Sequence, residues 1–407
     1  MIAIIPIAAV SPAPTSLGGS GRAAPPPLAL YVHWPWCVRK CPYCDFNSHE
    51  SGGAVDDTLE AAYLAALIAD LEAALPKIWN RPVSSVFIGG GTPSLMRAET
   101  VEALLAAIRM RVPLHPGAEI TLEANPGTAE AAKFAGFRAA GVNRLSIGVQ
   151  SFDDAKLVAL GRIHDSAEAR RAIDLALKNF ERVNLDLMYA LPQQKLSEAV
   201  NDIATAISAG VSHISAYHLT LEPNTPFHHA PPPLPDDDLA ADMQETVEAA
   251  LGAAGFMHYE TSAFAKPDQQ CLHNLNYWNF GDYLGIGAGA HSKLSNHETI
   301  WREARHRNPR AYLAGAASSD FISTRTPIAR TDLPGEFMMN ALRLNAGFPL
   351  PLFAERTGLP LAAIEKSALA ARREGLLEVM GGRMRPTARG RRFLNQLLAG
   401  FLGDAGG

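Results

Sequence analysis

The chain has 407 residues, of which 47% are hydrophobic and 19% are charged, and its formal net charge is −5. This length favours one large domain with a smaller one, and the composition is typical of a globular protein with an ample core. The negative charge gives no support for binding to nucleic acid. No segment reaches the ~20 uncharged apolar residues that a transmembrane helix needs, although peripheral contact with a membrane stays open.

Residues 1–27 are expected to form a disordered leader, and the alternative is an over-extended start site. The first residues are apolar but include no basic residue, and residues 11–27 are rich in Pro, Ser, Gly and Ala. A secretory signal needs a positively charged start, which is missing here. The four cysteines show no pattern of disulfide pairing, which indicates a reducing compartment. We therefore expect a cytoplasmic protein.

Residues 28–222 alternate short apolar runs with amphipathic segments rich in Ala and Leu. This alternation predicts parallel βα units joined by right-handed crossovers. The expected strands lie at 28–32, 83–88, 119–123, 143–149, 182–188 and 213–219, and the expected helices at 57–75, 98–111, 128–140, 166–179 and 197–209. Six such units predict an α/β fold with a partial (β/α)6 barrel, similar to an incomplete TIM barrel.

Three of the four cysteines, Cys37, Cys41 and Cys44, lie close together directly after the first expected strand. Their spacing, C-x3-C-x2-C, suits a [4Fe–4S] cluster in which three thiolates hold three irons. The fourth iron then stays open to a non-protein ligand. A structural zinc site would need a second ligand pair, which His33 and His49 could supply. A disulfide would leave an odd thiol, and unrelated buried thiols are a further alternative. We favour the cluster.

Polar groups follow the other expected strands where these end. A glycine run at 89–93 follows the second strand, Glu123 ends the third, Gln150 ends the fourth, and Asp186 lies in the fifth. The carboxyl ends of parallel strands meet at one face, so we expect these groups to form one site. Arg162 offers a bidentate partner for a ligand carboxylate. The plainer alternatives are a turn closed by glycine, helix caps made by the carboxylates, and a solvated surface arginine.

These motifs together resemble the radical S-adenosylmethionine (SAM) proteins, and more narrowly the oxygen-independent coproporphyrinogen III oxidase family. Segments 31–33, 89–93, 144–152 and 184–189 carry the resemblance, which extends from residue 28 onward. It implies SAM bound to the open iron and cleaved by one electron to methionine and a 5′-deoxyadenosyl radical. Residues that match contacts to this SAM are Tyr31, Gly90 and Glu123. Residues that match contacts to a second SAM in the family's oxidases are Tyr43, Gly91, Thr92, Gln150, Arg162 and Asp186.

One position separates two branches of this family. The oxidases have a further cysteine two positions after the third one, where this chain has Phe46. The oxidases also carry a structured N-terminal extension. Both differences favour the family's haem-chaperone branch over its oxidase branch, and neither removes the cluster or the SAM site.

A later segment, residues 271–278, combines Cys271, His273, Tyr277 and Trp278. Cysteine and histidine are ligands of haem iron, and flat aromatic rings pack on a porphyrin face. The H-N-x-x-Y-W pattern of the segment resembles the one associated with the haem-chaperone branch. The alternative is that the aromatic residues only anchor the edge of the barrel and that His273 is a core histidine.

Three regions are expected after the leader. Residues 28–255 are predicted to form the barrel, and residues 256–330 a β and loop extension that contains the haem-type segment. Residues 331–407 are predicted to form the small, mainly helical C-terminal domain of this family, with a β-hairpin across Gly381 and Gly382. This domain is similar to a winged helix. Because shape alone does not establish DNA binding, we interpret it as a lid or a partner surface.

The sequence therefore predicts a haem chaperone that binds haem, a [4Fe–4S] cluster and SAM. Its expected partners are haem, haem-acceptor proteins and an electron donor. The alternative is an oxygen-independent coproporphyrinogen III oxidase that makes protoporphyrinogen IX, so the question of enzyme activity stays open. A third hypothesis, an iron–sulfur interaction protein without turnover, is disfavoured by Gly90, Glu123 and Arg162.

Overall fold

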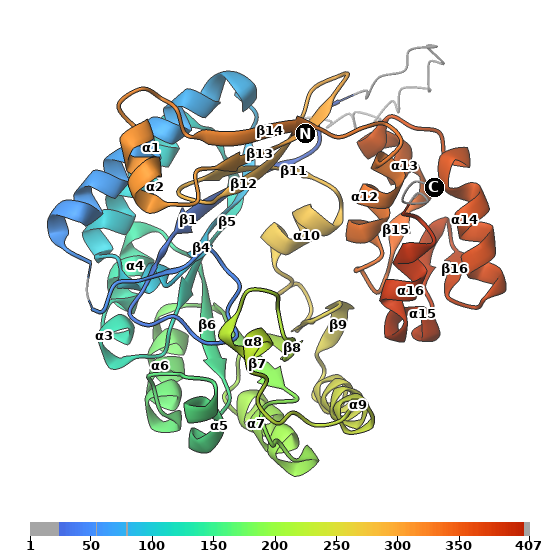
Figure 1. Ribbon diagram of the computed structural model, residues 1–407, viewed down its shortest axis with the longest axis horizontal. Helices are drawn as coiled ribbons and strands as arrows, with labels where there is room; N and C mark the ends of the chain where they lie inside the picture. The colour runs from blue at the N-terminus through green and yellow to red at the C-terminus, as the bar shows by residue number, and fades with distance from the viewer. Residues whose placement is uncertain (1–23, 54, 79, 403–407) are drawn as a thin grey trace, which may run out of the picture.

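A computed structural model describes residues 24–53, 55–78 and 80–402 of the chain. Most of the predicted leader, residues 1–23, lies outside the described residues. A curved sheet of 12 strands dominates the fold, in the order β14-β13-β12-β11-β1-β4-β5-β6-β7-β8-β10-β9. Helices cover its outer face, and one short helix, α10, lies on its concave side (Figure 1).

The six predicted strands are confirmed, and they are parallel neighbours in the sheet. They are β1 (Leu28–Trp34), β4 (Val83–Gly90), β5 (Leu114–Ala124), β6 (Arg144–Gln150), β7 (Arg182–Tyr189) and β8 (His213–His218). Each is apolar on the face turned to the helices, where Val86, Ile88 and Leu145 are fully buried. Strands buried on both faces form because the crossover helices cover them.

The crossover helices follow the predicted alternation closely. They are α1 (Asp57–Ile78), η1 (Pro93–Leu95), α2 (Ala98–Arg111), α3 (Thr128–Ala131), α4 (Phe134–Ala140), α5 (Asp154–Ala159), α6 (Ser166–Asn179) and α7 (Leu196–Ser208). The single helix expected at 128–140 is divided into α3 and α4. The break lies next to Lys133, whose ammonium donates to the carbonyls of Ser94, Leu95 and Met96. That contact fastens the break to the turn after β4.

The sheet continues beyond the six parallel strands at both of its edges. On the β8 side, α8 (Pro226–His229) and α9 (Asp237–Ala253) lead to the antiparallel strands β9 (Met257–Glu260) and β10 (Ala263–Ala265). On the β1 side lie β11 (Asp282–Ile286), β12 (His291–Ser295), β13 (Ile300–Arg305) and β14 (Ile322–Pro327), with α11 (Pro309–Gly315) between the last two. β11 pairs in parallel with β1, and β12 to β14 are antiparallel.

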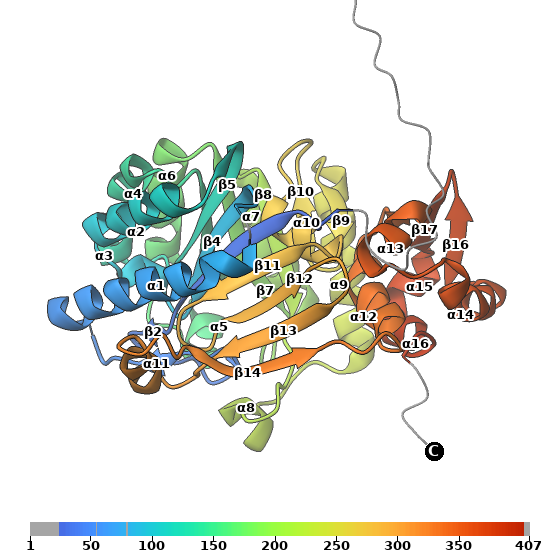
Figure 2. The ribbon, with the colours of Figure 1, turned by 90° about the horizontal axis from the view of Figure 1, so that it is seen from above.

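The strand order ends at β14 and β9, so the (β/α)6 core is a partial, open barrel, as the sequence predicted. Figure 2 shows β11 to β14 extending the sheet away from the helical layer of the core. Part of this extension is fastened to α1 by buried charges. The guanidinium of Arg305 bonds both Asp70 and Glu303, and all three side chains are almost completely buried. Such pairs fix the position of an element because an unpaired buried charge is costly.

The C-terminal region has a separate apolar core that contains Phe337, Phe348 and Phe353. Its helices are α12 (Leu333–Ala341), α13 (Leu350–Thr357), α14 (Ala362–Arg373), α15 (Ala388–Arg392) and α16 (Leu394–Ala399). Its small sheet has the order β15 (Phe348–Pro349), β17 (Arg383–Pro386), β16 (Leu377–Met380). The predicted hairpin and the mainly helical, winged-helix-like character are confirmed. None of the helices in the described part of the chain is long and apolar enough to cross a membrane.

Candidate functional site: a cysteine loop and a cavity at the strand ends

The cysteine loop begins where β1 ends and is closed on itself. Its two sides are β2 (Trp36–Cys37) and β3 (His49–Glu50), which pair in parallel. Cys44 N donates to Cys41 O at 3.2 Å, and the Lys40 ammonium donates to Phe46 O at 3.0 Å. The three predicted thiols therefore lie on one compact turn at the carboxyl end of the first strand.

The chemistry of this turn fits an iron–sulfur cluster. Burial raises the pKa of the Cys37 and Cys44 thiols, so cations must be present to hold them as thiolates. Within the described residues, no three His, Cys, Asp or Glu side chains converge on a single ion. In a cubane cluster each thiolate binds a different iron, so the three thiols do not have to converge on one ion.

The zinc alternative loses its proposed ligand His33. The Tyr31 hydroxyl is 2.9 Å from His33 Nδ1, and the carbonyl of Asn47 is 2.9 Å from Nε2. Both ring nitrogens thus have partners within the protein, and burial lowers the pKa of this histidine to about 4. His33 is a structural group that connects β1 to the cysteine loop.

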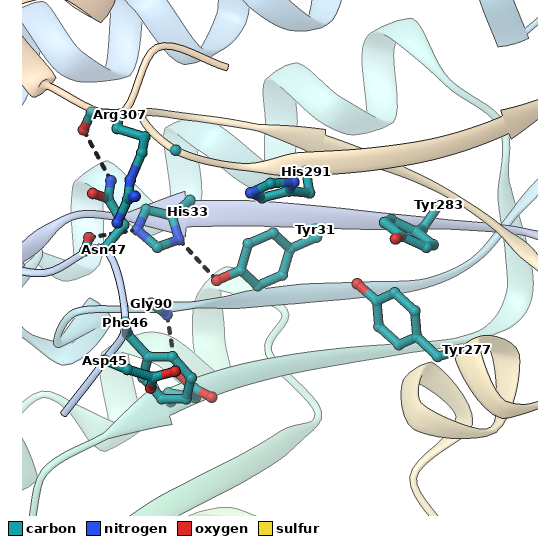
Figure 3. Close-up of a pocket in the computed structure, with 12 residues that line it drawn as sticks. Tyr31, His33, Asp45, Phe46, Asn47, Gly90, Tyr277, Tyr283, His291 and Arg307 are labelled. Atoms are coloured by element: carbon teal, nitrogen blue, oxygen red, sulfur yellow. Dashed lines mark hydrogen bonds between the residues drawn. The ribbon is translucent and has the colours of Figure 1, made fainter. Parts of the chain in front are cut away.

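A cavity of about 440 Å³ opens beside the cysteine loop (Figure 3). Its walls come from three sources: the ends of β1, β4 and β5, the end of the cysteine loop, and the later strands with α10 (Leu272–Trp278). The lining residues are Tyr31, His33, Asp45, Phe46, Asn47, Gly90, Glu123, Tyr277, Tyr283, Gly289, His291 and Arg307. This volume lies in the range typical of ligand pockets.

The residues matched to the first SAM all line this cavity. They are Tyr31, Gly90 and Glu123. Gly90 N donates to Glu123 Oε2 at 3.0 Å, which joins the ends of β4 and β5. A Cβ on Gly90 would lie 2.5 Å from the His33 ring, and the backbone φ there is +115°. Only glycine satisfies both conditions.

Three of the six residues in the second set matched to SAM, Thr92, Arg162 and Tyr43, lie around Asn125, just beyond β5. Asn125 donates to Thr92 Oγ1 at 3.0 Å and accepts from Arg162 Nη2 at 2.7 Å. Arg162 Nη1 in turn lies 3.6 Å from Cys41 Sγ, and Arg162 Nε is buried without a partner among the described residues. Burial raises the pKa of Tyr43, which lies on the cysteine loop next to this group. The arrangement places a fixed cation and an unsatisfied donor against the cysteines, where a polar cofactor fits.

The other members of the second set lie along the same strand ends. A Cβ on Gly91 would lie 2.5 Å from Trp36 O, so the glycine loop packs directly on β2. Gln150 ends β6 with a φ of +70°. Asp186 on β7 accepts from Ser146 Oγ at 3.0 Å and from Asn184 Nδ2 at 2.9 Å. The three residues lie on or beside the strands that the sequence assigned to them. No role for Asn125 followed from the sequence, where its only signal is its position just after Glu123.

Glu123 and Asp186 influence each other across the inside of the barrel. Burial and then the charge of Asp186 raise the pKa of Glu123 to about 8, and burial also raises the pKa of Asp186. Glu123 is therefore protonated at neutral pH, and it can donate a hydrogen bond to a ligand as well as accept one from Gly90.

Glu123→Gln tests this protonation state through the pH dependence of stability. The folded protein holds a proton on Glu123 up to about pH 8, whereas the unfolded chain releases it near the ordinary value of 4.5. Wild type should therefore lose stability as pH rises from about 5 to 8, and the neutral glutamine variant should lose less. Urea unfolding of anaerobic, cluster-loaded protein across this range measures the difference. Glu102→Gln, on an exposed helix face, is the control. If the difference in free energy of unfolding between wild type and Glu123→Gln is the same at every pH, the assigned protonation state is wrong.

The structure separates the four residues of the predicted haem segment. Cys271 precedes α10, and its thiol donates to Glu119 Oε1 at 3.3 Å; burial raises its pKa to about 12. His273 is buried, with Ser85 Oγ 3.0 Å from Nδ1 and Tyr277 OH 3.3 Å from Nε2. Among the four, Tyr277 lines the cavity, with its ring 4.5 Å from that of Tyr283. Trp278 stacks under the guanidinium of Arg343.

Fold and motif together define a class of protein. Residues 31–206 match the family model of the radical SAM superfamily, and residues 328–393 match that of the HemN C-terminal domain. The chain is a radical SAM protein, and the superfamily implies a [4Fe–4S] cluster and SAM as cofactors.

Comparison with curated proteins narrows the class. The chain is 47% identical to the haem chaperone HemW of Escherichia coli and 46% identical to that of Haemophilus influenzae, over 93% of this chain and 98–99% of those proteins. A HemW of Mycobacterium tuberculosis is 36% identical over 96% of this chain. The chain belongs to the HemW family, within the wider family of coproporphyrinogen oxidase-like radical SAM proteins.

A solved structure supports the fold. Coproporphyrinogen III oxidase (HemN) from Escherichia coli superposes with a TM-score of 0.78 at 22% identity, covering 94% of this chain and 92% of that one. At this identity the likeness establishes the shared architecture alone.

Proposed function

We propose that this protein is a haem chaperone, which binds haem in the cavity at the strand ends and passes it to acceptor proteins. The observation that carries the proposal is that one cavity is lined both by the residues matched to SAM and by Tyr277 of the haem-type segment. The names of the relatives, which describe haem chaperones, support the same function.

In this proposal Cys37, Cys41 and Cys44 hold the [4Fe–4S] cluster. Tyr31, Gly90 and Glu123 would hold SAM beside the iron that no cysteine binds. The cluster and SAM would supply one-electron chemistry when bound. The protein positions them: Arg162 fixes a positive charge beside Cys41, and the packed glycine loop brings backbone close to the cofactor. Tyr43, Gly91, Thr92, Gln150 and Asp186 form the rest of the polar surroundings.

Phe46 supports the chaperone over the oxidase. Its side chain is 62% exposed although it is large and apolar, and it lines the cavity at the end of the cysteine loop (Figure 3). An exposed phenyl ring gains stability when a flat apolar ligand covers it. A porphyrin offers such a face. In the oxidase branch this position has a thiol, which offers different chemistry.

The haem-type segment contributes in two ways in this proposal. Tyr277 contacts the porphyrin, and its partner His273 orients it through the 3.3 Å contact between Nε2 and the hydroxyl. Cys271 and Trp278 hold α10 in place through Glu119 and Arg343. Haem ligation by His273 would require its two existing contacts to break.

Haemin titration tests the proposed site. Wild type should bind haemin about stoichiometrically, and Tyr277→Ala should weaken binding roughly tenfold because one aromatic contact is lost. His273→Ala should weaken haemin binding because Tyr277 loses the residue that orients it. The Soret maximum should not change, since in this proposal His273 is not a ligand of the haem iron. Phe393→Ala, which removes an exposed ring on the C-terminal domain, should bind as wild type does. Absence of haemin binding to wild type would overturn the function, and a Soret shift in His273→Ala would make His273 an axial ligand.

A further inference from the structure

Arg307 is a charged residue that lines the cavity, and no contact with the cluster or with SAM has been assigned to it. It lies between β13 and α11, and its backbone carbonyl accepts from Asn47 Nδ2 at 2.9 Å. That bond, together with the one from Asn47 Nδ2 to Ala288 O, joins the cysteine loop to the later strands. The backbone at Arg307 is therefore fixed, while its side chain is exposed at the cavity (Figure 3).

The neighbouring arginines are paired within the protein, but Arg307 is not. Arg302 pairs with Glu336, Arg305 with Asp70 and Glu303, and Arg325 with Glu303. No carboxylate in the described part of the chain lies within 4.0 Å of the Arg307 guanidinium. A cation that lines a cavity without an internal partner remains available to an anion from outside.

The other charged groups of the cavity do not cancel this cation. Asp45 lines the cavity on the cysteine loop and forms no ion pair with Arg307. Glu123 is held neutral by its raised pKa. Two imidazoles near Arg307 also have lowered pKa values, chiefly because of burial. A hydrogen bond with the Arg307 backbone partly opposes the shift of the His49 pKa, whereas the charges of Lys40 and Arg307 add to it. The charges of Arg302 and Arg307 add to the lowering of the His291 pKa. The guanidinium thus faces a cavity wall that is mostly uncharged.

The cavity wall that carries Arg307 differs from the wall that carries the groups matched to SAM. Tyr31, Gly90 and Glu123 come from β1, β4 and β5. Tyr283 and His291 come from β11 and β12 of the sheet extension, and Arg307 comes from the loop between β13 and α11. The extension side therefore combines an aromatic surface with a cation. A tetrapyrrole is complementary to this surface, because its flat ring can pack on the aromatic side chains and its ionised propionates can pair with the cation.

We propose that Arg307 binds a propionate carboxylate of the tetrapyrrole and so fixes its orientation in the cavity. This inference rests on the proposed haem-binding function and names the group that is recognised. The guanidinium fork forms two parallel hydrogen bonds with a carboxylate, which a lysine ammonium does not reproduce. The carboxylate of SAM has the same chemistry, so the test must distinguish the two ligands.

The experiment compares haemin with haemin dimethyl ester, in which the propionates are uncharged. Wild type should bind haemin about 10- to 100-fold more tightly than the ester, since a hydrogen bond to a charged group is lost. Arg307→Ala should weaken haemin binding by a similar factor, bind the ester as wild type does, and abolish the difference between the two. Arg307→Lys should retain part of the preference. Arg310→Ala, three residues further on at an exposed position, should match wild type for both ligands.

Several results would overturn the assignment, and they are distinct from failure of the proposed function. If wild type binds haemin but Arg307→Ala keeps the preference for the free acid, another group recognises the propionates. If Arg307→Ala loses SAM affinity in calorimetry and keeps haemin affinity, the recognised carboxylate belongs to SAM. If wild type binds neither haemin nor its ester, the haem-binding function itself fails.

Discussion

Cys41→Ala should leave the anaerobically reconstituted protein almost without an iron–sulfur cluster. A cubane that already relies on three protein thiolates has no replacement for a lost one, because no further cysteine lies near the loop. Iron and sulfide should fall from about four per chain in wild type by roughly tenfold, together with the cluster absorbance. The loss of Cys41 also leaves the buried guanidinium of Arg162 without its sulfur neighbour at 3.6 Å.

Cys271→Ala is the matched control for this loss. Cys271 is the fourth cysteine of the chain, it is 1% exposed, and its thiol bonds Glu119 rather than facing the loop. This variant should retain the full iron content. Normal cluster content in Cys41→Ala, or its loss in Cys271→Ala, would contradict the assignment of the three ligands.

Glu119→Ala should be strongly destabilising, because Glu119 on β5 pairs with Arg144 and Arg182 at the starts of β6 and β7. The carboxylate is 1% exposed and lies 3.0 Å from Arg182 Nη1 and 3.9 Å from Arg144 Nε. It also accepts from the backbone N–H groups of Leu272 and His273, which start α10. Burial alone would raise the pKa of Glu119, but the two arginines and these hydrogen bonds hold it below its ordinary value. Removal leaves the buried guanidinium of Arg144 and the partly exposed guanidinium of Arg182 without this anion.

Loss of one partner from such a buried network costs about 3–5 kcal/mol in the free energy of unfolding. Urea unfolding of Glu119→Ala at neutral pH measures this cost. Haemin titration of the same variant should also weaken, because α10 loses the contacts that place Tyr277 in the cavity. Glu72→Ala is the control: Glu72 pairs with Arg111 on the surface and should cost less than about 1 kcal/mol. A change in Glu119→Ala as small as in the control would show that the network does not support the fold.

Much of the fold and part of the site followed from local sequence. The six strands were placed because apolar runs separated by amphipathic helices have one compact solution, a parallel sheet covered by helices. The position of Glu123, Gln150 and Asp186 at one face followed from the same topology. The cysteine loop was identified because three thiols at that spacing have few structural uses.

Other parts of the site depend on contacts between residues that are far apart in the chain. Asn47 bonds carbonyls of Ala288 and Arg307, more than 200 residues away. The parallel pairing of β11 with β1 brings Tyr283 to the cavity, and the antiparallel β12 beside β11 brings His291; neither pairing has a local sequence signal. Arg307 carries no motif, and the role proposed for it depends on the absence of a nearby carboxylate among the described residues. Such features are determined by tertiary packing.

The haem-type segment shows the same limit within eight residues. Sequence treated Cys271, His273, Tyr277 and Trp278 as one group with equal access to a ligand. In the fold, Tyr277 reaches the cavity while Cys271 and His273 are buried among polar partners. Cys271 caps the start of α10 and bonds Glu119, and His273 lies one turn before Tyr277 on the same face, where Ser85 and the Tyr277 hydroxyl surround its ring. These tertiary contacts are the physical reason.

The choice between haem delivery and porphyrin oxidation is the central claim, and one paired assay decides it. Cluster-loaded protein is given SAM, a reductant and coproporphyrinogen III under anaerobic conditions, and haem-loaded protein is given an apo-haemoprotein acceptor in parallel. We predict transfer of haem to the acceptor and no formation of protoporphyrinogen IX. Turnover of coproporphyrinogen without haem transfer would contradict the chaperone function and make the protein an oxidase.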